Sequence, residues 1–122
     1  MLIALLLLSG AIGAPARYLL DGFVQGRSRG VFPLGTFAIN FSGSFVLGVV
    51  TGAALYRGLG PLPKAAIGTG FCGAYTTFST FSYETVRLLE EGSVRTASLN
   101  AVASVVVGLI AAAAGIALLA AI

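Results

Sequence analysis

The sequence contains no histidine, no tryptophan and a single cysteine among its 122 residues. Without histidine, the most frequent general base of enzymes is absent, and a zinc site would lack most of its usual ligands. Cys72 alone cannot form a disulfide within the chain, and in its apolar, glycine-rich surroundings we expect a small buried hydrophobe. These absences argue against an enzyme and against a zinc site.

Charged side chains are also scarce. Seven basic and four acidic residues make up 9% of the chain, against 57% hydrophobic residues, and the mean hydropathy is +1.00. A soluble domain of this length needs far more polar surface to cover its core. The composition therefore indicates an integral membrane protein, whose partner is the lipid bilayer and not nucleic acid. The apolar start LIALLLLSG also suits a signal peptide, but no basic residue precedes it and more apolar sequence follows.

Four apolar segments are long enough to cross a membrane as helices, because a bilayer core about 30 Å thick needs roughly 20 helical residues. These predicted spans are residues 2–20, 33–56, 64–90 and 95–121. Short breaks separate them, so consecutive helices should run antiparallel. The sequence predicts a single all-α domain with four transmembrane helices, a multi-pass protein of the plasma membrane.

The loop cations give only a weak orientation signal. With the N-terminus inside, Arg57 and Lys64 would lie on the inner side, and Arg27, Arg29 and Arg95 on the other. Positive residues favour cytoplasmic loops, so the balance leans slightly towards an outer N-terminus. Such a small bias leads us to hypothesise dual topology, which a C-terminal tag found on one side only would contradict.

Small residues are frequent within the spans, among them Gly43 and Gly48 in the second and Gly115 in the fourth. Helices in lipid associate by close backbone approach and by hydrogen bonds, since apolar surface gains nothing by leaving apolar lipid. These glycines therefore predict helix–helix contacts. Four thin helices can hardly enclose a polar route alone, so an oligomer, most simply a dimer, is expected.

Polar side chains form two stripes at helical spacing. In the second span, Thr36, Asn40 and Ser44 share one face, and in the fourth span Asn100 and Ser104 do so. Such residues either hydrogen-bond neighbouring helices together or line a polar pathway. Both interpretations stay open for the Asn40 stripe, whereas the fourth-span stripe taken alone favours a bond between helices.

The third span is predicted to be broken near its middle. Gly68, Gly70 and Gly73 precede the run TTFSTFS at residues 76–82, and glycine weakens a helix. Irregular backbone at membrane depth persists only where protein buries it or where it lines a cavity. The carbonyls freed there would need partners, of which a bound cation is one. The alternative is a glycine-rich packing contact.

Beyond the break, Phe78 and Phe81 lie on one helical face among several hydroxyl groups. Ordinary packing is one interpretation. In the other interpretation, these groups attract a small anion through the positive ends of dipoles: the ring edges, the hydroxyl protons and an amide N–H₂. None of the groups carries a full charge, so they bind the anion weakly enough to release it. Two ionisable residues also fall within spans. Arg17 either extends to the interface or concentrates anions at a vestibule, and Glu84 is expected to pair with Arg87.

Three segments together resemble the Fluc (CrcB-like) fluoride channel family: GAIGAPARY at 10–18, PLGTFAINFSGSFVLG at 33–48 and GTGFCGAYTTFSTFSYE at 68–84. They occur in the family's order, and the TTFSTFS run is the most specific of the motifs. The resemblance implies a passive fluoride channel through which a cell loses fluoride and resists its toxicity. It further implies an antiparallel, dual-topology homodimer of four-helix subunits with two fluoride pathways.

The same resemblance implies roles for individual residues. Arg17 would lie at a vestibule, and the main-chain carbonyls of Gly73 and Thr76 from both subunits would hold a structural sodium ion at the dimer interface. In the fourth helix, Asn100 stands where some relatives carry tyrosine and Gly108 where they carry serine, so the last polar step of that helix is missing. The residues implied for the fluoride pathway are Phe78, Phe81, Asn40, Thr36, Thr77 and Ser104.

Two other classes of protein, a transporter and an assembly subunit, fit the sequence less well than a channel does. A proton-coupled small multidrug transporter needs a carboxylate embedded in its first helix, whereas Asp21 lies only at that helix's end. The absence of tryptophan also removes a favoured surface for aromatic cations. A non-transporting assembly subunit would account for the small residues but not for polar stripes beside a phenylalanine pair.

Overall fold

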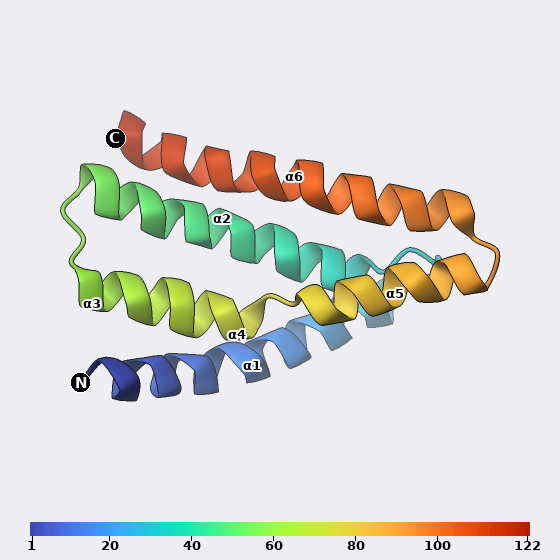
Figure 1. The fold of residues 1–122 in the computed structure, drawn as a ribbon, viewed down its shortest axis with the longest axis horizontal. Helices are drawn as coiled ribbons and strands as arrows, with labels where there is room; N and C mark the ends of the chain where they lie inside the picture. The colour runs from blue at the N-terminus through green and yellow to red at the C-terminus, as the bar shows by residue number, and fades with distance from the viewer.

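A computed structural model describes all 122 residues, which form helices and connecting turns without any strand. Four helical rods lie side by side and alternate in direction, so that both termini lie at the same end (Figure 1). One of the seven elements, η1, is a π-helix. The elements are α1 (Leu2–Arg27), α2 (Leu34–Tyr56), α3 (Pro61–Lys64), η1 (Ala65–Cys72), α4 (Gly73–Tyr75), α5 (Phe78–Glu90) and α6 (Val94–Ala121).

Three of the rods, α1, α2 and α6, are single helices long and apolar enough to cross a membrane. The remaining rod, the third along the chain, consists of α3, η1, α4 and α5 in succession, which confirms four helices with the third one broken. The first helix continues to Arg27, beyond the predicted span that ended at Leu20. Its last turns are tied to the next rod because the side-chain oxygen of Gln25 accepts a hydrogen bond of 3.1 Å from the Gly35 N–H.

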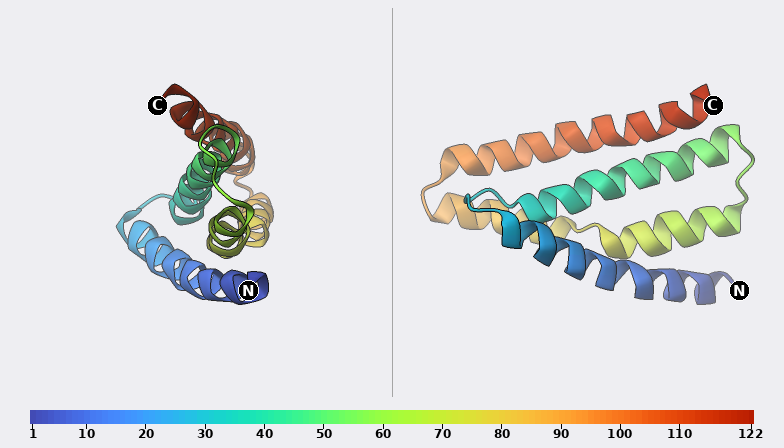
Figure 2. Two further views of the ribbon diagram at one scale, coloured as in Figure 1. Left: turned by 90° about the vertical axis from the view of Figure 1, so that its left-hand side faces the viewer. Right: turned by 180° about the vertical axis from the view of Figure 1, so that it is seen from behind.

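The rods form an open arc when viewed along their length, with α1 and α6 at its two ends (Figure 2). The central helix α2 has its most extensive contacts with α6, while α1 packs mainly against η1. Glycine allows the close approach of α2 and α6: a Cβ atom on Gly48 would overlap the main chain of Ala112, and one on Gly115 would overlap that of Phe45. The predicted role of these glycines at helix–helix contacts is thus confirmed.

The break in the third rod lies at Thr76 and Thr77, after the glycine-rich segment and not within it. Both threonines have extended backbone, with φ/ψ of −80°/162° and −147°/123°. The preceding glycines stay helical: Gly68 and Gly70 lie within η1, and Gly73 begins α4. The wider π geometry of η1 is rare in proteins, and where it occurs it is often at a functional site. β-Branched side chains favour extended backbone, and Thr77 also caps α5, because its hydroxyl oxygen accepts a 3.2 Å bond from the Thr80 N–H.

Only 18 of the 122 residues are buried within the subunit. Large hydrophobic side chains are exposed on every helical element except the short α4. In lipid such a surface carries no penalty, and backbone polar groups are satisfied inside the helices. The subunit therefore has a small core of its own, and most of its apolar surface is available to lipid or to another protein chain.

Candidate functional site

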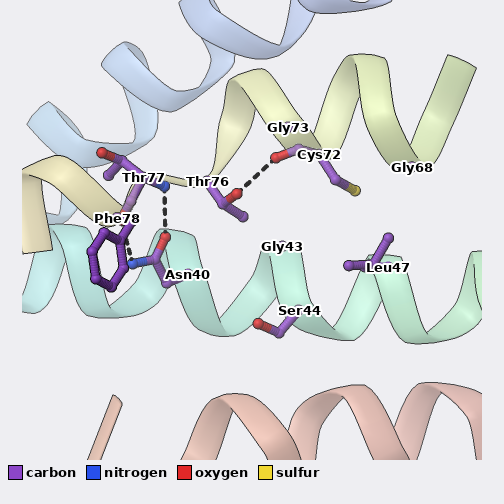
Figure 3. Close-up of a pocket in the computed structure, with 10 residues that line it drawn as sticks. All are labelled: Asn40, Gly43, Ser44, Leu47, Gly68, Cys72, Gly73, Thr76, Thr77 and Phe78. Carbon is purple, nitrogen blue, oxygen red and sulfur yellow. Dashed lines mark hydrogen bonds between the residues drawn. The ribbon is translucent and has the colours of Figure 1, made fainter. Parts of the chain in front are cut away.

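A cavity of about 320 Å³ lies where the third rod is broken, between that rod and α2 (Figure 3). Its walls carry amide, hydroxyl, main-chain and aromatic groups but no charged side chain. The cavity is open on one side of the subunit. The residues that line it are Asn40, Gly43, Ser44, Leu47, Gly68, Cys72, Gly73, Thr76, Thr77 and Phe78.

The side chain of Asn40 is bonded to the broken backbone at two points. Its Nδ2 donates to the Thr77 carbonyl and its Oδ1 accepts from the Thr77 N–H, both at 2.9 Å. In an unbroken α-helix the Thr77 N–H would donate to the carbonyl of Gly73. The amide thus satisfies main-chain groups that the break removes from the helix, and one N–H of its NH₂ group takes part in neither bond.

The hydroxyl groups of the two threonines at the break point back into the chain. The Thr76 hydroxyl donates to the carbonyl of Cys72 at 2.8 Å, and the Thr77 hydroxyl donates to the hydroxyl oxygen of Thr80 at 3.1 Å. No hydrogen bond ends on the carbonyl of Thr76. The break therefore leaves a main-chain oxygen unbonded beside the cavity, where a Cβ atom on Gly73 would meet only open space.

The two phenylalanines lie together, yet only one of them lines the cavity. Their ring centroids are 6.0 Å apart with planes tilted by 48°. The Phe78 side chain is 79% exposed and borders the open side of the cavity, next to the Asn40 amide (Figure 3). Phe81 is half-buried and does not line it. Within one subunit the ring of Phe78 is consequently available to whatever covers this surface.

Three further residues predicted for the site lie outside this cavity. Thr36 is buried near the start of α2, one turn before Asn40. Ser104 donates a long hydrogen bond of 3.4 Å to the Asn100 side chain. Arg17 lies on α1, where its Nε atom is buried without a hydrogen-bond partner.

The fourth-helix stripe connects two rods. Asn100 is 2% exposed, and its amide donates to the Thr85 hydroxyl of α5 at 2.8 Å. Thr85 in turn donates to the carbonyl of Phe81. The bond between helices that this stripe favoured is present, and it lies away from the lining of the cavity.

The predicted pairing of Glu84 with Arg87 is wrong. Arg87 forms its ion pair with Glu91, one helical turn further on, at 2.9 Å between Nε and Oε1. Glu84 instead turns towards the interior, where one carboxylate oxygen is buried without a hydrogen-bond partner. A spacing of three residues permitted the predicted pair, but a second acidic residue at a spacing of four was available on the solvent side.

Several cavity-lining residues were not singled out as site residues from the sequence. Gly43 and Leu47 continue the Asn40 face of α2 at helical spacing. That spacing could have indicated them, but neither residue is polar and so neither stands out by residue type. Cys72 is buried, as expected, but it also borders the cavity. Its carbonyl accepts hydrogen bonds from both the N–H and the hydroxyl of Thr76.

Comparison with known proteins gives consistent results. A family model described as "CrcB-like protein, Camphor Resistance (CrcB)" matches residues 4–116. Fluoride-specific ion channel FluC 1 of Streptomyces avermitilis is 55% identical over 113 residues, which cover 92% of this chain and 91% of that protein. FluC 1 of Leifsonia xyli is 51% identical, covering 89% and 80%, and FluC of Geobacter sulfurreducens is 47% identical, covering 88% and 87%.

Proposed function

Since this chain belongs to the CrcB-like family, we propose that it is a fluoride-specific ion channel, a passive route through which fluoride leaves the cell. It is a multi-pass protein of the plasma membrane and not an enzyme. The observation that carries the proposal is the uncharged polar cavity at the helix break, lined by Asn40, Thr77 and Phe78. Export down the fluoride gradient gives the cell resistance to fluoride toxicity.

The chemistry of the cavity suits a small, strongly hydrated anion. An amide N–H and the edge of an aromatic ring present positive ends of dipoles, and neither carries a full charge that would trap the ion. The N–H of Asn40 that is free of Thr77 and the ring of Phe78 are the two groups in position to replace water around fluoride. Phe81, Thr36, Thr77 and Ser104 extend the proposed pathway, and Arg17 draws anions to its mouth.

We infer that the working form is an antiparallel homodimer with dual topology. The support is threefold: the cavity is open on one side, Phe78 is 79% exposed beside it, and much of the apolar surface has no cover within the subunit. The nearly balanced loop cations permit both orientations. A second copy would enclose the two cavities and so complete two pathways.

A sodium ion at the centre of this dimer is the remaining part of the proposal. Hard cations prefer oxygen ligands, and the chain contains no cluster of acidic, cysteine or histidine side chains to hold a metal. The main-chain carbonyls of Gly73 and Thr76 suit the role, because the Thr76 oxygen accepts no hydrogen bond and the usual helical donor to Gly73 is bonded to Asn40. The partner subunit would supply the same pair.

Fluoride efflux from liposomes that contain the purified protein tests the function. A fluoride electrode follows the external concentration, a potassium ionophore clamps the voltage, and chloride-loaded liposomes serve as the control. We expect rapid fluoride loss without chloride loss. Absence of fluoride loss from protein shown to be folded would contradict the proposal, as would equal loss of both anions.

A further inference from the structure

The break at Thr76 and Thr77 raises the question of what holds an extended segment in place between two helices. An interrupted helix in a membrane leaves main-chain groups without partners, and each such group is costly in a dry environment. Here the N–H and the carbonyl of Thr77 both find their partner on one side chain, the amide of Asn40. A single residue of α2 therefore takes over the bonds of both main-chain groups of Thr77.

The neighbouring contacts hold the same segment against α2. Gly43 lies one turn beyond Asn40, and the methyl group of Thr76 occupies the space that a Cβ atom there would fill. The hydroxyl groups of Ser42 and Tyr75 are hydrogen-bonded at 2.8 Å. Contacts at Tyr75 and Thr76 thus hold the end of α4 and the start of the break close to α2. The Asn40 amide holds Thr77, the last residue before α5.

We propose that Asn40 is a positioning residue for the break in the third helix, in addition to its place in the fluoride pathway. Its two bonds to Thr77 fix the plane of the amide, with one N–H and the oxygen used on the same edge. The second N–H is then directed away from that edge, and Phe78 begins α5 at a fixed position beside it. The inference rests on the proposed channel function only for its consequence on conduction.

A comparison with Asn100 separates this role from an ordinary bond between helices. The Asn100 amide donates to a side-chain hydroxyl, that of Thr85, and both helices are regular where they are joined. Removing it would loosen a contact between two rods whose backbones keep their own hydrogen bonds. Removing the Asn40 amide would instead leave main-chain groups of Thr77 without partners.

Amide hydrogen exchange at Thr77 measures this role directly. The full chain, labelled with ¹⁵N and ¹³C, is reconstituted in lipid bilayers and exchange is followed by NMR. In the wild type we expect slow exchange at Thr77 although this residue lies outside any helix. In Asn40→Leu exchange at Thr77 should accelerate by about tenfold, as expected for loss of a buried hydrogen bond, while Asn100→Leu should leave it unchanged.

The variant Asn40→Asp gives a second, independent reading. An ionised aspartate keeps an oxygen to accept the Thr77 N–H but has no proton to donate to the Thr77 carbonyl. At a pH at which the ¹³C signal of the new carboxyl shows it to be ionised, exchange should stay slow while the ¹³C signal of the Thr77 carbonyl shifts. Fast exchange in the wild type, unchanged exchange in Asn40→Leu, or an unchanged carbonyl signal in Asn40→Asp would each overturn the proposal.

Fluoride efflux measured on the same samples keeps the two proposals distinguishable. If the wild type shows no fluoride-selective efflux, only the channel function is overturned, because exchange at Thr77 does not depend on conduction. If the wild type conducts fluoride, we expect Asn40→Leu to show both a loss of fluoride efflux and faster exchange at Thr77. Full efflux in Asn40→Leu despite accelerated exchange would contradict the effect of positioning on conduction.

Discussion

The two sides of α2 are built on opposite principles. Towards α6, Gly48 and Gly115 remove side chains so that two regular helices touch along their backbones. Towards the third rod, α2 supplies polar side chains, above all Asn40, to a backbone that has left the helix at Thr77. The regular side forms a scaffold, and the irregular side forms a cavity. Polar groups at membrane depth can thus contact a ligand where the backbone departs from helical geometry.

The largest effect is expected from a bulky residue on the regular side. In Gly48→Leu the new side chain would overlap the main chain of Ala112 on α6, and neither backbone can move without separating the rods. Overpacking of this kind costs about 3 kcal/mol or more when the backbone is the obstacle. We expect little folded protein by size-exclusion chromatography in detergent.

The matched control for that variant is Gly22→Leu on α1. A Cβ atom at Gly22 meets nothing within 4 Å, so a leucine there faces open space and improves helix propensity. The chromatographic profile should match that of the wild type. Equal losses in the two variants would contradict the role of the glycine contact between α2 and α6.

A smaller change should disturb the irregular side while the scaffold remains. In Gly43→Ala the new methyl group would overlap the methyl group of Thr76, at an expected cost of about 1–3 kcal/mol and with a lower rate of fluoride efflux. The double variant Gly43→Ala with Thr76→Ser removes the second methyl group and keeps the hydroxyl bond to Cys72. It should regain most of the efflux, and failure to do so would contradict the close contact at the break.

Asn100→Leu should reduce stability modestly and spare conduction. The substitution removes the 2.8 Å bond to Thr85 between α5 and α6, and hydrogen bonds between membrane helices contribute about 1 kcal/mol or less. We expect a lower thermal midpoint with fluoride efflux retained. Loss of efflux at unchanged stability would assign Asn100 to the pathway instead.

The smallest effect is expected at the exposed end of α5. Arg87 and Glu91 form a surface ion pair, and solvent and salt screen such pairs strongly. Arg87→Ala should leave both the thermal midpoint and fluoride efflux unchanged within error. A clear loss of either would show that the polar contacts important to the irregular side extend beyond the cavity.

The sequence was sufficient for the helical architecture because apolar length and glycine spacing are local signals. The broken third helix was also predictable, from glycines followed by hydroxyl-bearing residues. The site of the break was not predictable. Glycine favours interruption, yet Gly68 and Gly70 lie in the π-helix η1 and Gly73 in α4, and the extended residues are Thr76 and Thr77. The helix η1 packs against α1, whose residues are far away in sequence, and local spacing cannot reveal such a contact.

The candidate site was predictable only in part, for a similar reason. Asn40 and Phe78 stand out by residue type, and both line the cavity. The bonds of Asn40 connect it to a residue 37 positions away, which spacing cannot indicate. Phe81 shares a helical face with Phe78 but lies further inside, because the direction of α5 after the break decides which ring reaches the opening.

Fluoride efflux by the Phe78→Ile variant tests most directly whether the cavity at the break carries the ion. The substitution keeps an apolar side chain of moderate size but removes the aromatic edge. Phe41→Ile on α2 is the control, since Phe41 is exposed and does not line the cavity. With oligomeric size verified for both proteins, we predict that Phe78→Ile lowers efflux to the level of protein-free liposomes and that Phe41→Ile conducts like the wild type. Wild-type efflux in Phe78→Ile would contradict the account.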